Sequence, residues 1–144
     1  MPYPSIFYPL KIDKTELENC LNCVASEKAK LRAIDESRKI FTKCALNDRC
    51  DCTELKEQTL RYLGLFSSYV AFAKRLNEKS QEEIKKAFIK QPQYSHRSPL
   101  NKKEAVFSEA SMEYYMTLVT LVTVMIDMQF KLDATNAGSS VLAQ

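Results

Sequence analysis

Five cysteines are the residues of this chain best suited to metal binding or redox chemistry. Cys20 and Cys23 form a C-x-x-C pair, and Cys44, Cys50 and Cys52 follow farther along the chain. A structural zinc site needs four ligands, usually as two closely spaced pairs, and the second group lacks that spacing. We therefore predict reduced, largely buried thiols, no metal and no cofactor. A small metal or redox protein that uses Cys20 and Cys23 is the alternative.

His96 is the only histidine of the chain. No neighbouring residue completes a nucleophile–base pair with it, and Pro92 and Pro99 flank it in a segment typical of a surface loop. With only two glycines, the chain also lacks the glycine-rich motifs that bind nucleotide phosphates. The sequence therefore predicts no catalytic residue, and a protein that is not an enzyme.

Basic residues without an intervening acid gather between Glu83 and Glu104. Such a patch could contact an anionic membrane, where each basic side chain contributes about 1 kcal/mol. A solvated face without a partner is the simpler interpretation. The formal net charge of +3 does not demand a polyanion, so we expect no nucleic acid partner. The candidate membrane-contact residues are Lys85, Lys86, Lys90, Arg97, Lys102 and Lys103.

The composition is that of a soluble globular protein, with 45% hydrophobic and 27% charged residues. The first residues after Met1 contain neither a basic segment nor a long apolar run, so no secretory signal is predicted. We therefore expect a cytoplasmic protein, with association to an anionic membrane if the candidate membrane-contact residues are used. The scarcity of glycine disfavours the many hairpin turns of an all-β fold.

The residues 114–126 form a run without charge, closed by Glu113 and Asp127. As a helix the run spans roughly 20 Å, which is shorter than the apolar core of about 30 Å of a bilayer. The run therefore predicts a helix buried on most of its circumference, in a soluble helical bundle or against a companion molecule. The threonines at 117, 120 and 123 share one side of that helix with Glu113 and Asp127.

The apolar spacing along the rest of the chain predicts an all-α fold in a single domain, residues 1–144. The fold would be a bundle of about four helices after a short extended or strand segment. Prolines at 2, 4 and 9 keep a helix from starting earlier. The predicted elements are an extended segment over 1–14, helices over 15–46, 52–77, 80–90 and 103–132, and a proline-flanked loop over 91–102.

Capping residues support three of these helix starts. Thr15 with Glu18, Asp51 with Glu54, and Ser80 with Glu83 each place a side-chain acceptor three residues before an acid. Gly64 falls inside the second helix and costs about 1 kcal/mol relative to alanine. We expect another backbone to approach the helix there.

Four stretches resemble the N-terminal part of the Bro-type domain of the ALIX/BROX family. SIFYPLKIDKTELENCL (5–21) resembles the opening strand and first helix of that domain, and TLRYLGLFSSYVAFAKRL (59–76) its tyrosine-rich helix. LNEKSQEEIKKAFIK (76–90) is similar to the segment that follows. EAVFSEASMEYYMTLVTLVTVMIDM (104–128) resembles the central helix, in which Phe107, Glu109, Met112 and Tyr115 would be packing positions.

The chain departs from the Bro-type pattern in two respects. It has no tryptophan, and Tyr94 stands near the place of the residue usual in the family. It also spans only about the first third of such a domain, so most of the pocket for ESCRT-III tails would lie beyond Gln144. No partner-binding residue is therefore carried over from the family, and those residues stay unknown.

The resemblance implies a non-catalytic adaptor or scaffold in endosomal sorting and ESCRT-associated membrane remodelling. Its partner would be the amphipathic C-terminal helix of an ESCRT-III-type protein. The alternative is an unrelated small helical module for protein–protein interaction or assembly, including a homo-oligomer. An apolar helix with too few neighbours would in either case recruit a partner.

Overall fold

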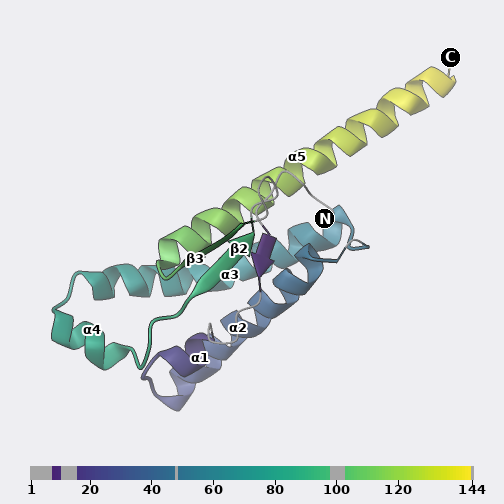
Figure 1. Ribbon diagram of the computed structural model, residues 1–144. Coiled ribbons are helices and arrows are strands. Elements are labelled where there is room, and N and C mark those ends of the chain that lie inside the picture. Colours follow the sequence, from purple (N-terminus) through teal and green to yellow (C-terminus); the bar gives the residue numbers. More distant parts are fainter. Residues whose placement is uncertain (1–7, 11–15, 48, 98–102, 144) are drawn as a thin grey trace.

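The computed structural model describes residues 8–10, 16–47, 49–97 and 103–143, and it is mostly helical (Figure 1). The predicted helical character is therefore confirmed, although the described residues form five helices and a three-stranded sheet. The helices are α1 (Leu17–Cys20), α2 (Ala25–Ala45), α3 (Cys52–Asn77), α4 (Gln81–Ala87) and α5 (Ala110–Ala143), and the strands are β1 (Tyr8–Leu10), β2 (Tyr94–Arg97) and β3 (Glu104–Phe107).

The helix predicted over 15–46 is two helices, α1 and α2. The chain between them is tied to the segment after α4, where Asn22 N–H donates to Ala87 C=O at 2.9 Å and Leu21 pairs with Phe88. These long-range backbone bonds interrupt the helix, a contact that local periodicity does not reveal. The predicted cap Thr15 lies outside the described residues. The Asp35 carboxylate of α2 instead accepts the N–H groups of Leu17 and Glu18, at the start of α1.

Helix α3 has the bounds that the sequence predicts, and Asp51 caps it by accepting the N–H of Glu54 at 2.7 Å. Ser80 caps α4 in the same way, through the N–H of Glu83, and α4 ends at Ala87 rather than at residue 90. The expectation that another backbone approaches α3 at Gly64 is wrong. A Cβ at Gly64 would meet nothing within 4 Å, so no backbone approaches α3 there.

The predicted loop over 91–102 contains the central strand of the sheet. Strand β2 pairs antiparallel with β1, and on its other side with β3 in a register that places Tyr94 opposite Phe107. Pro92 precedes the strand without interrupting it, which is a position that a sheet tolerates, and Pro99 lies outside the described residues. Because residues 104–107 are held in β3, the last helix begins at Ala110, not at residue 103.

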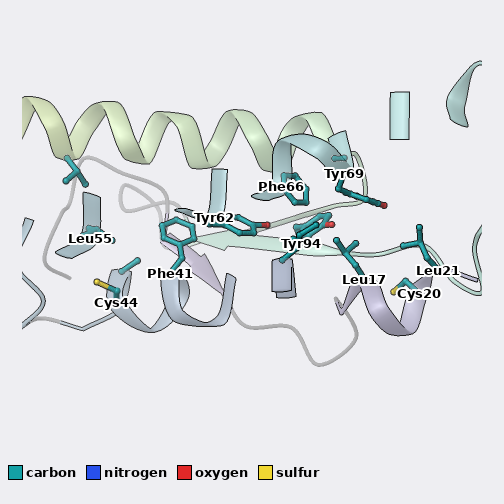
Figure 2. Packing of buried hydrophobic residues seen from close by; sticks show 14 residues of the cluster. Leu17, Cys20, Leu21, Phe41, Cys44, Leu55, Tyr62, Phe66, Tyr69 and Tyr94 are labelled. Atoms are coloured by element: carbon teal, nitrogen blue, oxygen red, sulfur yellow. The ribbon is translucent and has the colours of Figure 1, made fainter. Parts of the chain in front are cut away.

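The core is a run of aromatic rings between the helices and the sheet (Figure 2). Phe41 of α2 stacks on Tyr62 of α3, with ring centroids 5.6 Å apart. Phe66 lies next along α3 and meets the ring of Tyr94 edge-on at 5.7 Å. Tyr94 then contacts Phe107 at 6.3 Å, so one line of rings joins α2, α3, β2 and β3. Aromatic pairs of this kind stabilise a fold by about 0.5–1.5 kcal/mol beyond their area.

Helix α5 packs along α3 and then continues past the rest of the fold (Figure 1). It extends to Ala143, beyond the predicted end at residue 132. Its C-terminal part projects away from the other elements, as Figure 1 shows in yellow. The helix therefore has one long packed side and a free opposite side.

Candidate functional site

Glu113, near the start of α5, is the centre of a buried polar network. One carboxylate oxygen accepts from Arg38 Nε at 2.9 Å and from Tyr62 Oη at 3.1 Å. The other lies 2.8 Å from His96 Nε2. The Arg38 guanidinium also lies 5.5 Å from the centre of the Tyr94 ring. The network therefore joins α2, α3, β2 and α5 through one side chain.

The hydrogen-bonding roles in this network determine its charge. An ionised carboxylate only accepts, so His96 Nε2 must carry a proton. His96 Nδ1 is buried and has no hydrogen-bond partner among the described residues, which disfavours a second, costly N–H at that atom. Arg38 and Glu113 form the buried ion pair of this network, and His96 adds a contact to the second carboxylate oxygen.

The pKa of Glu113 reflects two opposing effects. Burial by itself would raise the pKa, but the Arg38 charge and the His96 hydrogen bond outweigh it and lower the pKa to about 2. Burial raises the pKa of Tyr62 well above its ordinary value, so this phenol stays a donor. The carboxylate of Glu113 is therefore ionised under ordinary conditions and needs its partners.

The prediction that His96 is a surface loop residue is wrong. Its side chain is fully buried on β2, it stacks on Phe107 with ring centroids 5.6 Å apart, and it contacts Glu113. Seventeen residues separate His96 from Glu113 and 75 separate Arg38 from it, so no local pattern joins them. Because Glu113, His96 and Tyr62 are fully enclosed, the network holds elements together and offers no surface to a solute.

The packed side of α5 combines polar side chains with the buried apolar residues Leu121 and Val124. The polar stripe faces inward: Glu113, Thr117 and Thr120 are fully buried. Each threonine hydroxyl donates to the carbonyl four residues earlier, Thr117 to Glu113 at 2.8 Å and Thr120 to Met116 at 3.1 Å. This local bonding satisfies the hydroxyls inside the fold. The polar side can therefore pack against α3.

The opposite side of α5 is apolar and exposed. Tyr115 is 59% exposed, Val122 48% and Phe130 68%. The expectation that this helix is buried on most of its circumference is therefore wrong for the chain alone, because α3 supplies its main packed neighbour. The exposed apolar stripe, as we call it, comprises Met112, Tyr115, Val119, Val122, Met125, Ile126 and Phe130.

A groove between α3 and α5 adjoins the N-terminal end of the exposed apolar stripe. Its volume is about 320 Å³, and Tyr115 belongs both to the groove and to the stripe. The α3 side is formed by Ser67, Val70, Ala71 and Lys74, and the α5 side by Ser111, Tyr114 and Tyr115. The groove is thus mainly apolar, with Lys74 the charged residue of its lining.

Residues 110–134 of α5 are long and apolar enough to cross a membrane, by length and composition alone. The prediction that the helix is too short to cross a membrane considered only residues 114–126, and it underestimated the length of the apolar helix. Only 22% of the apolar window is buried within the fold. Glu113 and Asp127 lie within this segment, and its polar side packs on α3. One such helix is weak support for a membrane span.

The cysteines differ from the prediction of five reduced thiols. Cys44 and Cys50 form a disulfide, because the turn between α2 and α3 brings their Cα atoms to 5.8 Å. Cys20, Cys23 and Cys52 are free of disulfide bonds, and Cys20 is buried. In the described parts of the chain, the one candidate metal-binding group consists of the two bonded cysteines and Glu54, not Cys20 with Cys23.

The basic residues predicted to contact a membrane lie on different elements. Lys85 and Lys86 are in the last turn of α4, whereas Arg97 ends β2 and pairs with Glu104 at 3.4 Å. Lys102 lies outside the described residues. Lys90 and Lys103 are exposed, the first after α4 and the second before β3. The described members of this set thus come from separate elements, and membrane contact by the set stays a prediction.

Comparisons with known proteins add no identification to this geometry. No protein-family model matches the chain, and no curated protein or solved structure shows significant similarity to it. The class of protein is therefore inferred from the helical fold, the groove and the exposed apolar stripe.

Proposed function

We propose that this protein is a non-catalytic interaction module that binds an amphipathic helix along the exposed side of α5. The observation that carries the proposal is the exposed apolar stripe together with the adjoining groove. Large contiguous apolar surface is unusual on a monomeric soluble protein and is typical of an interaction site. A helix is the partner of choice because its apolar side chains recur at the same three- and four-residue steps.

The rigid support of this surface favours binding over catalysis. The buried Glu113 network fixes the start of α5 against α2, α3 and β2, so the groove has a defined shape. Binding to a preformed surface avoids the loss of conformational entropy that ordering it would cost. The network thus acts as a scaffold for the interaction surface.

The resemblance to Bro-type domains supplies one specific partner. In that case the chain would be an adaptor of endosomal sorting in the cytoplasm, and the bound segment a C-terminal helix of an ESCRT-III-type protein. The competing proposal is an assembly module whose partner is unrelated to endosomal sorting. Both forms use the same side of α5, and they differ only in the sequence of the helix that binds.

Peptide titration with a variant in the groove tests the proposal. Ala71→Trp places a large ring in the groove, and Ser68→Trp puts the same ring on an exposed α3 position outside its lining. We expect fluorescence anisotropy to show that a labelled ESCRT-III C-terminal helix binds wild type and Ser68→Trp. Ala71→Trp should weaken binding by at least about tenfold, or about 1.4 kcal/mol.

Two results would contradict parts of this proposal. If the ESCRT-III peptide fails to bind wild type while other amphipathic helices bind, the endosomal form is wrong and the assembly form stands. If no helical peptide binds and the protein also remains monomeric, the exposed side of α5 is not a helix-binding surface.

A further inference from the structure

We propose that the helix bound by the exposed apolar stripe is the α5 of a second copy of this chain, paired antiparallel. This inference rests on the proposed function and names its partner. Met112, Tyr115, Val119, Val122 and Ile126 follow one another at alternating steps of three and four residues. Residues at that spacing lie along one side of a helix, where they can pack against a second helix. One stripe can then serve as both halves of a two-fold interface.

The charges on α5 favour the antiparallel direction. The two acids between Met112 and Phe130 lie outside the stripe, because Glu113 is buried and Asp127 pairs with Lys131, so two copies meet without repulsion over its length. In a parallel pair each residue would face its own copy, and the next seam position, Asp133, would oppose a second Asp133. In an antiparallel pair centred between Val119 and Val122, Asp133 instead falls beyond the start of the partner's helix at Ala110. Opposed helix dipoles also favour this direction.

The available area matches the needs of a stable dimer. The side chains of the stripe are about half exposed, and a fully covered aromatic side chain such as Tyr115 or Phe130 buries roughly 150–250 Å². The stripe with its groove therefore offers on the order of several hundred Å² per copy, comparable with the roughly 800 Å² on one side of a standard interface. A dimer would remove most of this apolar surface from water.

Phe130 and the groove complement one another in this arrangement. The centre of symmetry between Val119 and Val122 brings Phe130 of one copy to Ser111 of the other, at the groove lining. Phe130 is 68% exposed, although its neighbours Asp127 and Lys131 contact Cys52 at the start of α3. Its ring can enter the partner's groove between α3 and α5. The contact occurs twice, once in each direction.

A protein partner accounts for this surface better than a bilayer does. Amphipathic helices that lie on membranes carry many Lys and Arg residues on their polar side. The polar side of α5 instead carries Glu113 and threonines, and it is packed against the fold. Asp133 would also approach an anionic surface with the wrong sign, whereas the charge of Asp127 is balanced by its ion pair with Lys131 at 3.3 Å. We therefore propose a protein partner for this surface, and vesicle binding is measured as the competing result.

The test measures the mass of the full chain in solution by sedimentation velocity. We expect a dimer for wild type and for Leu60→Glu, which puts a charge on an equally exposed apolar position of α3 outside the stripe. Val122→Glu, at the centre of the seam, should raise the dimer dissociation constant by about 100-fold. Ile126→Gln should weaken the dimer without adding charge. Circular dichroism should show unchanged helix content in each variant.

A charge pair tests the direction of pairing. Antiparallel α5 helices place Tyr115 against Ile126 of the partner, so Tyr115→Glu and Ile126→Lys should each weaken the dimer and their combination should restore it. In a parallel pair the combination would be the weakest, because like charges would meet. Restoration would support the antiparallel dimer, and further weakening would overturn that direction.

The remaining outcomes separate this inference from the proposed function. A wild-type monomer that still binds helical peptides overturns the self-pairing and leaves the proposed function in place. A monomer that binds neither peptides nor a second copy overturns both. Sedimentation of a monomer with phosphatidylserine vesicles, abolished by Val122→Glu, would assign the stripe to a membrane and overturn the dimer.

Discussion

His96 Nε2 lies 2.8 Å from Glu113 Oε2, and both side chains are fully buried. This contact joins the central strand of the sheet to the long helix α5. Arg38 and Tyr62 donate to the other carboxylate oxygen, so both oxygens of Glu113 have hydrogen-bond partners. Arg38 and Glu113 thereby form a buried ion pair. Removing one partner of a buried ion pair lowers the stability of a fold far more than removing one partner of an exposed pair.

Replacing Glu113 should therefore destabilise the fold strongly. Glu113→Gln leaves the buried Arg38 guanidinium without its countercharge, and we expect a loss of about 3–5 kcal/mol in the free energy of unfolding, measured with urea. Glu104→Gln, which alters the exposed pair with Arg97, should change it by less than about 0.5 kcal/mol. Arg38→Met combined with Glu113→Gln should cost less than the sum of the two single changes. A cost for Glu113→Gln similar to that of Glu104→Gln would contradict the role of the network.

The low pKa of Glu113 predicts acid sensitivity. Its pKa of about 2 in the folded state lies below the ordinary value of 4.5, so the native state favours the ionised form. The resulting stability is present above pH 4.5 and is lost as the pH falls toward 2. Asp35 acts in the opposite direction: burial raises its pKa from 3.8 to about 6, so its contribution declines as the pH rises through that range.

Urea midpoints measured from pH 6 to pH 2 would check this prediction. The difference in stability between wild type and Glu113→Gln should be largest above about pH 4.5 and should shrink toward pH 2. Taking the difference cancels the contribution of Asp35, which both proteins share. A difference that stays constant with pH would show that Glu113 has the same pKa in the folded and the unfolded protein, and would contradict the prediction.

Gly64→Ala should stabilise the protein. Gly64 lies inside α3, and an added Cβ would meet nothing within 4 Å. Alanine reduces the freedom of the unfolded chain and favours the helix, so we expect a gain of about 0.5–1 kcal/mol, read as a higher thermal midpoint. A loss of stability would mean that another backbone or a partner occupies the space beside Gly64.

The Cys44–Cys50 disulfide predicts three reactive thiols in the unfolded, unreduced protein. Ellman titration in denaturant should count Cys20, Cys23 and Cys52, and it should count five cysteines after reduction. Cys50→Ser should lower the free energy of unfolding by about 2 kcal/mol under oxidising conditions, from the entropy of closing a short loop. Under reducing conditions the variant and wild type should have nearly equal stability. Five thiols before reduction would contradict the bond.

Local sequence signals determined the helical elements of this protein. The apolar periodicity of residues 52–77 predicts one helix from residues that are close in sequence. Asp51 and Ser80 each accept a hydrogen bond from an N–H group in the first turn of the helix that follows. Such short-range interactions act in the same way in almost any fold, so they can be read without knowledge of the neighbours.

The tertiary structure decided where each of these elements lies and which side of it is covered. Strand β2 exists because two other segments supply its backbone partners, and the break before α2 exists because residues 87–89 bond to the chain there. His96 is buried for the same reason, since its partners Glu113 and Phe107 come from later elements. Sequence spacing contains no information about such distant contacts.

Helix α5 shows this division most clearly. The sequence alone determined that it has a threonine side and an apolar side, because a helical repeat of 3.6 residues assigns residues to sides. Only the tertiary structure decided that the threonine side faces inward, since Arg38 and His96 satisfy Glu113 there and the threonines bond to their own helix. The apolar side is left exposed because α3, the main neighbour of α5, packs on the other side of the helix.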